Sequence, residues 1–584
     1  MKPMTESAAP KPGMRYSSNG KVNREDGADA GAAKAVYPSR EQLFRMALIS
    51  LPILWAILTL ALQYAAAILP PKESSKAGVC TASTFTAALP QDASVELTYP
   101  VPGGGSFGEG PSNLGYPLNA TNLPELCAVI IRVPSGTSTY RFGLFLPAVS
   151  NWNSRFLATG NGGFLGGIDW VDMGAGPHYG FATLSTDTGH NSASTQSWAY
   201  KDGEAQRDWG YRAMHGSVDL GKRLTAAYYG RDIAYSYYSG CSTGGRQGLK
   251  EIQISPDSFN GVLVGAPAWD TTGLMSWLTA LGTWNLPASD PKAFTTTAQY
   301  SLLASTVLSQ CDKVDGLVDN IVSTPEACKP DLSVIQCGKR GVNADNCLTP
   351  QQIGTAQKVW NDYYTSKGDL VYNGLELSGE NQWDVYTLYG ASENFDTQWE
   401  KFWVYNNTAW NWQQYSEKVF YDSVQANPGN ATADSFDISA FRRAGGKLIL
   451  YQGLADGLIS ARSSLHYYNE TAKAIPGMQH CGGSPAAVKA PWYIGSWSQP
   501  ARLTGTAGAY SVPGFQDAEH DALLALMRWT ENGTAVDAII ATAWDDDGSQ
   551  ELSVYRQRPI CPYPKKATYD GTGDPNSASS WACA

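Results

Sequence analysis

The chain has 584 residues, more than one ordinary domain holds, so we expect either two domains or one core enlarged by an insertion. Only 16% of its residues are charged, against a usual ~25%, and the formal net charge is -11. The sequence has no cluster of Lys and Arg residues that could bind successive phosphates of a nucleic acid, which argues against nucleic acid as a partner.

The N-terminal part of the chain is first polar and then strongly apolar. Residues 1–40 are rich in Ala, Gly, Ser and Lys without apolar periodicity, which predicts a disordered cytoplasmic tail over residues 1–45. No charged residue interrupts residues 46–71, and roughly 20 apolar residues suffice to span a bilayer. The long polar start favours an uncleaved type II signal-anchor, with cleavage and secretion as the alternative.

Cysteines and glycosylation sequons indicate the compartment of the chain's body. All 10 cysteines follow the apolar segment, and their even number fits disulfides in an oxidising compartment. The sequons follow the segment as well. We therefore expect an extracellular or lumenal body. The sequon asparagines are Asn119, Asn406, Asn430, Asn469 and Asn532.

Strand-like and helix-like segments alternate after the apolar segment. β-rich runs at residues 128–133 and 233–240 are followed, respectively, by a glycine-rich turn and by a helix-like segment at residues 245–254. Helical spacing also extends over residues 208–230. Alternation of this kind predicts an α/β fold with a doubly wound, mostly parallel sheet.

The alternation stops after residue 270 and returns only near residue 441. The segment between them carries four cysteines and many of the tryptophans. We interpret residues 271–440 as an inserted lid domain, and residues 72–270 with 441–584 as the domain that carries the sheet. Most of the lid tryptophans are expected to form the lid core rather than to contact a substrate.

A nucleophile pattern lies at the end of the second β-rich run. Residues 240–244 match G-x-S-x-G, in which small neighbours let a serine sit on a strained turn between a strand and a helix. Ser106 satisfies the same pattern in a glycine-rich stretch with no strand before it and no helix after it, so we treat it as a chance match. Ser242 is therefore the candidate nucleophile.

A serine nucleophile needs a histidine to accept its proton and a carboxylate to orient that histidine. In hydrolases with this elbow the acid follows the serine along the chain, in a loop after a strand, and the histidine comes last. Asp456 fits the acid because it follows the apolar run KLILYQG. The histidines after it are His466, His480 and His520.

The choice among these histidines depends on neighbouring cysteines. His466 and His520 lie in segments expected to be helical, where a structural role is the simpler explanation. Cys481 follows His480 directly, just as Cys241 precedes the candidate serine, and a disulfide between the two would hold nucleophile and base together. This coincidence favours His480, while His520 remains the alternative.

The paired Cys-Ser and His-Cys elements with an Asp between them resemble the tannase and feruloyl esterase family. The resemblance covers roughly residues 80–583 and includes the segments LPELCAVIIRVP, RFLATGNGGF, STDTGH, GYRAMHG, YYSGCSTGGRQGL, GAPAW, YQGLADGLIS and HCGG. It implies an α/β-hydrolase fold whose lid covers the active site. It also implies a triad of Ser242, Asp456 and His480, joined by a Cys241–Cys481 bridge.

The same resemblance extends to the oxyanion hole and to the other disulfides. The backbone N–H of Thr243 would hold the tetrahedral oxyanion, with Gly162 in the turn at residues 160–163 as the second donor. Alternatively, the turn at residues 160–163 is a tight loop with no role in binding the oxyanion. Proximity and resemblance imply the pairs Cys80–Cys127, Cys311–Cys328, Cys337–Cys347 and Cys561–Cys583.

Three carboxylates gather within a short stretch of the predicted lid. Asp312, Asp315 and Asp319 surround a glycine, and hard oxygen ligands of this kind suit Ca²⁺. By spacing alone the stretch is better explained as a solvated Asp-rich turn. It resembles the family's calcium loop, in which the carbonyls of Leu317 and Ile321 would complete the ligands of a structural ion.

These observations predict a serine carboxylic ester hydrolase that cleaves aromatic acid esters through an acyl-enzyme, without an organic cofactor. The resemblance implies gallate or hydroxycinnamate esters as substrates, either small or attached to plant polyphenols or polysaccharides, and the sequence leaves the acyl group open. Two rival hypotheses are a membrane-tethered binding protein on a hydrolase fold and a serine peptidase of the same fold. The intact Ser, Asp and His set argues against the first, and the paired Cys-Ser and His-Cys elements argue against the second.

Overall fold

The computed structural model describes most of the chain after the apolar segment. The predicted tail and signal-anchor lie outside the described residues, as do His480 and Cys481. Among the helices that are described, none is long and apolar enough to cross a membrane. The described ranges are 78–193, 195–383, 395–475, 512, 514–544 and 553–584.

The centre of the fold is an eight-stranded sheet. Its parallel part runs β7-β6-β8-β9-β12, and an antiparallel part adds β5, β4 and β1 beyond β7. The predicted doubly wound sheet is confirmed, and the antiparallel edge is an addition to it. In sheet order the strands are β1 Ser94–Val101, β4 Leu126–Ser135, β5 Ser138–Pro147, β7 Phe181–Thr186, β6 Arg155–Thr159, β8 Tyr235–Cys241, β9 Gly261–Gly265 and β12 Lys447–Tyr451.

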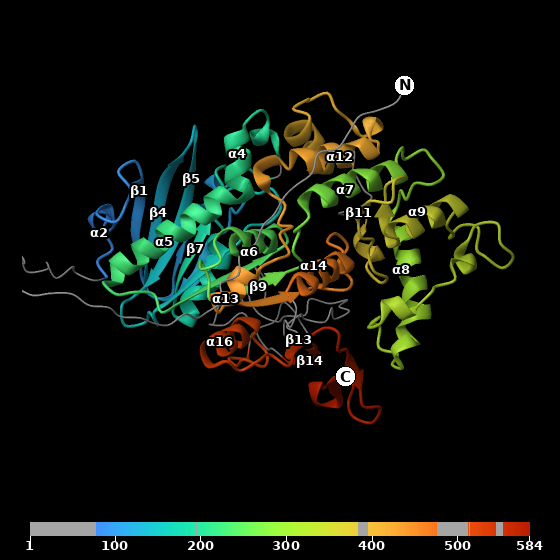
Figure 1. Cartoon of the computed structure of the whole chain (residues 1–584). Coiled ribbons are helices and arrows are strands. Elements are labelled where there is room, and N and C mark those ends of the chain that lie inside the picture. The colour runs from blue at the N-terminus through green and yellow to red at the C-terminus, as the bar shows by residue number, and fades with distance from the viewer. Residues whose placement is uncertain (1–77, 194, 384–394, 476–511, 513, 545–552) are drawn as a thin grey trace, which may run out of the picture. The chain divides into compact units, whose positions relative to one another are not determined.

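Helices cover both faces of the parallel strands because successive side chains of a strand point to opposite faces. In β9, Val262 and Val264 belong to one buried cluster, shared with α5 and α6, whereas Leu263 belongs to another, shared with α16. In Figure 1, α5 and α6 lie together over the strands and α16, in red, lies apart from them. The covering helices are α5 Ala213–Tyr229, α6 Thr243–Ile254, α14 Ala461–Ala474, α3 Trp170–Ala175 and α16 Ala522–Asn532.

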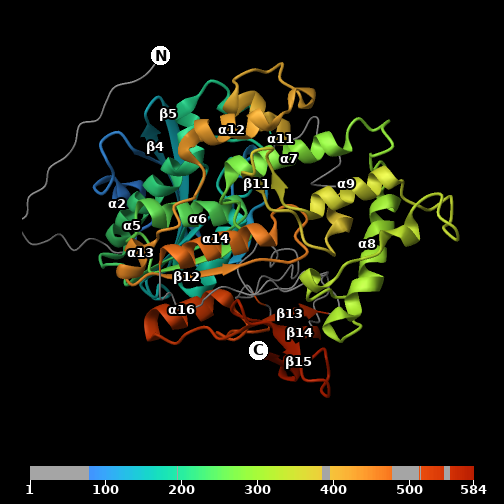
Figure 2. The same ribbon diagram turned by 45° about the vertical axis from the view of Figure 1, so that its right-hand side comes forward.

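The segment between β9 and β12 is mainly helical and has its own hydrophobic cluster. Trp277, Trp383, Trp399 and Trp403 are buried in that cluster, as expected for lid tryptophans that form a core. Figures 1 and 2 both show α8 and α9 far from α2 and β1. The elements of this segment are α7 Thr271–Asn285, α8 Thr297–Cys311, α9 Pro350–Trp360, β10 Tyr363–Tyr364, β11 Leu370–Tyr372, α11 Phe395–Gln398 and α12 Glu417–Ala426.

Short elements complete the described chain. Strand pairs β13–β14 and β15–β16 follow α16 and stand outside the central sheet, and Figure 2 shows them in red beside α16. The remaining bounds are α2 Ala82–Thr86, β2 Gly105–Phe107, β3 Ala120–Leu123, α4 Gly203–Arg207, α13 Ser439–Arg443, β13 Ile539–Trp544, β14 Val554–Ile560, β15 Ala567–Tyr569 and β16 Trp581–Cys583.

Disulfides join segments throughout the described chain. The pairs are Cys80–Cys127, Cys311–Cys328, Cys337–Cys347 and Cys561–Cys583. All four are the pairs that the family resemblance implied. The fifth predicted pair joins Cys241 to Cys481, which lies outside the described residues, so this bridge stays a prediction.

Candidate active site

Ser242 occupies the sharp turn between β8 and α6. Its backbone has φ +53° and ψ -122°, a region that non-glycine residues rarely adopt and that is typical of residues held for function. The surroundings hold it there: its N–H donates to the carbonyl of Gly265 at 3.0 Å, and its carbonyl accepts from Ala268 N–H at 3.0 Å. The predicted nucleophile elbow is thus present in the fold.

Glycines around the serine let the backbone segments approach closely. A Cβ on Gly240 would lie 2.6 Å from the carbonyl oxygen of Gly244, and a Cβ on Gly245 would lie 2.9 Å from that of Gly265. Neither position accepts a larger residue without backbone movement. Ser106, the other match to the pattern, lies inside the short strand β2 and has no such turn.

Asp456 lies in the loop after β12, two strands along the sheet from the strand that ends before Ser242. Since β8, β9 and β12 are parallel, their carboxyl ends share one edge of the sheet, where ligands bind in folds of this kind. One carboxylate oxygen of Asp456 accepts from the N–H groups of Leu458 and Ile459, both at 2.9 Å, and the other accepts from Gln452 at 3.1 Å. These bonds fix its orientation.

The thiol of Cys241, which directly precedes Ser242, is influenced by the carboxylate of Asp456. Burial, followed by the negative charge of Asp456, raises the pKa of the Cys241 thiol to about 12. Burial also raises the pKa of Asp456, while the donors from Ile459 and Leu458 lower it. Ser242 and Asp456 both follow strands that end at the same edge of the sheet, β8 and β12. His480, the predicted base, lies outside the described residues and stays a prediction.

The two other histidines have local partners. His466 lies on α14, as expected, and its ring stacks on that of Trp269, with ring centroids 5.9 Å apart. His520 lies in the turn before α16 rather than inside a helix. Its Nδ1 lies 2.8 Å from the Asp517 carboxylate, and its ring stacks on Phe515. Both histidines therefore have local contacts, and the choice of His480 over His520 as the base stays a prediction.

The glycine-rich turn predicted to hold the oxyanion packs against the start of α6. A Cβ on Gly160 would lie 2.5 Å from the Cα of Gly244, and Asn161 N–H donates to Gln247 on α6 at 2.9 Å. The N–H of Gly162 donates to the hydroxyl of Tyr116 at 2.7 Å. This amide could serve an oxyanion only by exchanging that bond.

Tyr116 is a neighbour of the site that the sequence did not reveal. Burial, followed by the negative charge of Asp169, raises the pKa of its phenol well above the usual value, so the hydroxyl stays protonated. It precedes Pro117 in a loop between η1 (Gly110–Ser112) and β3. No local motif marks it, because its role depends on the contact with a turn 46 residues away.

Aromatic rings connect the same turn to the lid segment. Phe164 stacks on Trp209, with ring centroids 4.6 Å apart, and lies 5.6 Å from the ring of Trp403 in the lid. Trp209 and Trp403 are themselves in contact at 5.1 Å. The lid segment therefore packs directly against the predicted oxyanion turn through these aromatic rings.

The predicted calcium loop follows α8. The carboxylate of Asp312 accepts from the N–H groups of Asp319, Asn320 and Ile321, at 3.0 to 3.1 Å. The Oδ2 atom of Asp315 is buried without a hydrogen-bond partner among the described residues. Within the described part of the chain, no group of three or more His, Cys, Asp and Glu side chains is arranged to hold a metal ion.

Arginines from β14 share the third carboxylate of this loop. Arg558 forms an ion pair with Asp319, and the guanidinium of Arg556 lies 3.5 Å from the same oxygen. The oxygen donors of this loop are of the type that Ca²⁺ prefers, but Asp312 accepts backbone N–H groups and Asp319 pairs with two arginines, so the ion stays a prediction. All five sequon asparagines are exposed, so their modification is sterically allowed and stays a prediction.

Known proteins similar to this chain match most of its length. The chain is 33% identical over 485 residues to feruloyl esterase C of Talaromyces stipitatus, covering 80% of this chain and 87% of that protein. It is 31% identical over 521 residues to a probable feruloyl esterase B-1 of Aspergillus flavus, covering 87% and 95%.

Solved structures show the same fold. Feruloyl esterase B from Aspergillus oryzae superposes with a TM-score of 0.76 at 28% identity, covering 86% of this chain and 99% of that one. The tannin acyl hydrolase from Aspergillus niger superposes with a TM-score of 0.64 at 20% identity, covering 86% and 95%, which supports the fold alone.

A family profile agrees with these relatives. The profile described as tannase and feruloyl esterase matches residues 127–427 and 390–584. The match includes both Ser242 on its elbow and Asp456 on the loop after β12. The chain belongs to the tannase and feruloyl esterase family and is a carboxylic ester hydrolase.

Proposed function

We propose that this protein hydrolyses esters of hydroxycinnamic acids, such as ferulate, through an acyl-enzyme on Ser242. The observation that carries the proposal is the strained elbow at Ser242, with the oriented carboxylate of Asp456 at the same edge of the sheet. The relatives with at least 31% identity that are described above are named feruloyl esterases, which favours ferulate over gallate.

In this mechanism the Ser242 hydroxyl attacks the ester carbonyl and gives its proton to His480. Asp456 stabilises the imidazolium that forms, and the N–H of Thr243 donates to the oxyanion. The alcohol leaves with the proton from His480, and a water molecule activated by the same histidine then releases the aromatic acid.

Hydrolysis of methyl ferulate and methyl gallate by the purified full chain tests the proposal. We expect cleavage of methyl ferulate to be the faster, and Ser242→Ala to reduce it about 10⁶-fold, to background. Ser106→Ala is the matched control, since it removes the serine of the second pattern, and should keep full activity. Background rates on both esters by the unaltered protein would contradict an aromatic esterase, and faster cleavage of methyl gallate would assign a tannase.

We further propose that the loop at Asp312, Asp315 and Asp319 binds a structural Ca²⁺ ion, with the carbonyls of Leu317 and Ile321. The buried, unpartnered oxygen of Asp315 supports this, because a cation would provide the missing partner. When bound, the ion would hold the lid loop that the Cys311–Cys328 disulfide closes.

Thermal unfolding in Ca²⁺ and in a chelator tests this site. At about 100 times the Kd, Ca²⁺ should stabilise the fold by roughly 2.7 kcal/mol, which raises Tm by several degrees. Asp315→Asn should remove the difference, and Asp345→Asn, at an exposed aspartate of the same segment, should keep it. Equal Tm values of the unaltered protein in both media would contradict calcium binding.

We also propose that the body is extracellular or lumenal, held by a signal-anchor at residues 46–71. Four disulfides in the described chain support an oxidising compartment. Fractionation and endoglycosidase treatment of the expressed chain should show a membrane-bound, glycosylated protein. A soluble product that lacks residues 46–71 would instead indicate cleavage and secretion.

A further inference from the structure

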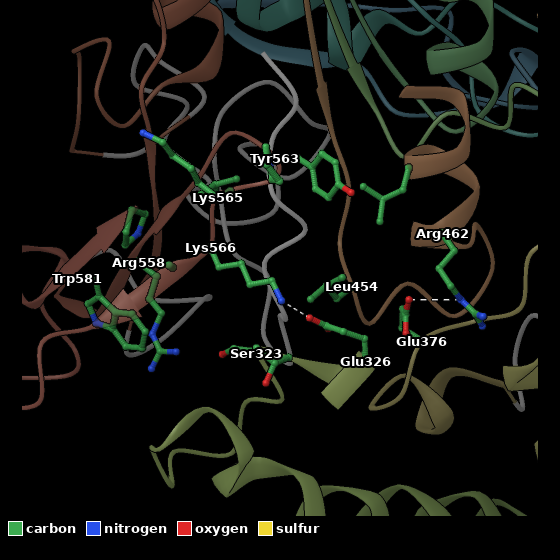
Figure 3. Close-up of a pocket in the computed structure, with 16 residues that line it drawn as sticks. Ser323, Glu326, Glu376, Leu454, Arg462, Arg558, Tyr563, Lys565, Lys566 and Trp581 are labelled. Atoms are coloured by element: carbon green, nitrogen blue, oxygen red, sulfur yellow. Dashed lines mark hydrogen bonds and ion pairs between the residues drawn. The ribbon is translucent and has the colours of Figure 1, made fainter. Parts of the chain in front are cut away.

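A cavity of about 470 Å³ lies between the lid segment and the C-terminal strands. We name it the Arg558 pocket. Figure 3 shows Arg558 beside Trp581 at one end and Arg462 beside Glu376 at the other. Leu454, which also lines it, precedes Asp456 by two residues in the loop after β12. The wall of the pocket therefore continues into the loop that carries the catalytic acid.

Arg558 is buried in this pocket with part of its hydrogen-bonding capacity unused. Its side chain is 7% exposed, and one terminal nitrogen pairs with Asp319. The Nε and Nη1 atoms are buried without a partner among the described residues. Unmade hydrogen bonds on a buried charge are costly, so an anion at these two nitrogens would be stabilised.

The other charged groups of the pocket leave an excess of positive charge. The lining has four cationic side chains and two carboxylates. Lys566 pairs with Glu326, and Arg462 lies 3.4 Å from Glu376, so both carboxylates already have partners. Lys565 is exposed and forms no ion pair with the residues that the structure describes. Asp319 already shares the charge of Arg558, so Lys565 is the unpaired cation of the lining, and Arg558 adds its two unused N–H donors.

Aromatic rings line the same cavity. The Arg558 guanidinium carbon lies 3.9 Å from the ring centroid of Trp581, so this cation is stacked and held in place. Tyr563 also lines the pocket and is only partly buried. An aromatic ring such as that of Tyr563 can pack against the C–H face of a sugar. The cavity of about 470 Å³ is larger than one sugar ring.

We propose that the Arg558 pocket binds a carboxylate-bearing sugar of the polysaccharide whose aromatic ester is cleaved at Ser242. The identity of that polysaccharide ester rests on the proposed function. Arg558 and Lys565 hold the carboxylate, and Tyr563 supports the sugar ring. Because Leu454 and Asp456 share one loop, an acidic sugar in the pocket anchors the chain next to the catalytic edge of the sheet.

Titration calorimetry of the full chain with methyl glucuronide and methyl glucoside tests the proposal, since the two probes differ only in the carboxylate. We expect at least tenfold tighter binding of the glucuronide. Arg558→Gln should remove that preference, because a charge-assisted hydrogen bond accounts for about tenfold or more in affinity. Lys565→Gln, at an exposed position that folding does not require, should weaken glucuronide binding a few-fold. Lys339→Gln, an exposed lysine outside the pocket, is the matched control and should bind as the unaltered protein does.

Three results would overturn the proposal. One is equal affinity of the unaltered protein for both glycosides, or no binding of either. Another is acetate binding as tightly as the glucuronide, which would leave a simple anion site. The third is an unchanged glucuronide affinity in both pocket variants. The glycosides carry no aromatic ester, so binding is measured independently of hydrolysis, and failure of the esterase assay would contradict the proposed function alone.

Discussion

At the scale of single residues, the catalytic centre depends on backbone conformations that are costly in isolation. The φ of +53° at Ser242 costs of order 1–3 kcal/mol, and the surrounding hydrogen bonds and close-packed glycines maintain it. The G-x-S-x-G pattern predicted this serine because its glycines are the residues that such close backbone contacts require. Asp456 was found in the same way, by its place after an apolar strand.

Replacing Asp456 by Asn tests its role as the orienting acid. The amide keeps the size of the side chain but loses the charge that stabilises a protonated histidine, so we expect kcat to fall about 10³–10⁴-fold with little change in KM. Methyl ferulate kinetics measure the effect, and an unchanged Tm checks the fold. A kcat within tenfold of the unaltered protein would rule out Asp456 as the triad acid.

At the scale of elements, the lid segment contains a buried carboxyl group. Glu380 begins the short 3-10 helix Glu380–Gln382 and is fully buried. One carboxyl oxygen accepts from Ser378 N–H at 2.9 Å and from Trp360 at 3.1 Å, and the other has no partner among the described residues. Burial raises the pKa of Glu380 from 4.5 to about 7.

This raised pKa predicts a pH-dependent stability. Below pH 4.5 the Glu380 carboxyl is protonated in both the folded and the unfolded chain. Its contribution to the free energy of unfolding is fully present there. Between pH 4.5 and about 7 the unfolded chain releases the proton first, so stability falls, by up to about 3 kcal/mol in all. Above pH 7 the contribution is lost.

Glu380→Gln should remove this part of the pH dependence, because the amide is neutral at every pH. Urea unfolding at pH 5 and pH 7.5 measures it: we expect a smaller loss of unfolding free energy between these values in the variant than in the unaltered protein. The exposed Glu326→Gln serves as control and should retain the full loss. Identical pH dependence in Glu380→Gln would show that the carboxyl is not buried as described.

At the scale of the whole molecule, the C-terminal part completes the catalytic domain. Glu531 on α16 pairs with the Nε and Nη2 atoms of Arg155 on β6, 376 residues earlier, and accepts from the hydroxyl of Tyr237 at 2.6 Å. The arginine side chain is 23% exposed and the glutamate 14%. This ion pair holds α16 against β6 in the central sheet.

Glu531→Gln should therefore lower the free energy of unfolding by roughly 2 kcal/mol, since a partly buried arginine loses its charged partner. Glu470→Gln breaks a pair with Lys473 within one helix at the surface and should cost at most about 0.5 kcal/mol. Urea denaturation compares the two variants with the unaltered chain. Equal effects of both substitutions would contradict the role of Glu531 in docking α16.

The sequence alone predicted the features that local patterns encode. Strand and helix periodicity predicted the parallel sheet, which is confirmed, and the position of Asp456 after an apolar run predicted the acid, because each depends on neighbouring residues only. Four disulfide pairs were predicted with the help of family resemblance. Sequence spacing by itself cannot fix such pairings, since many connectivities are compatible with one set of cysteines.

The tertiary structure decided what long-range contacts determine. Tyr116 at the Gly162 amide and Trp403 against Phe164 meet only after the chain has folded. The pairing of Arg558 with Asp319 likewise joins β14 to the lid loop across 239 residues. Such partners leave no periodic or motif signal, because the position of each is set by the packing of whole elements. Sequence therefore predicted the candidate catalytic residues of this esterase from local patterns, and only the folded chain shows which distant segments pack around them.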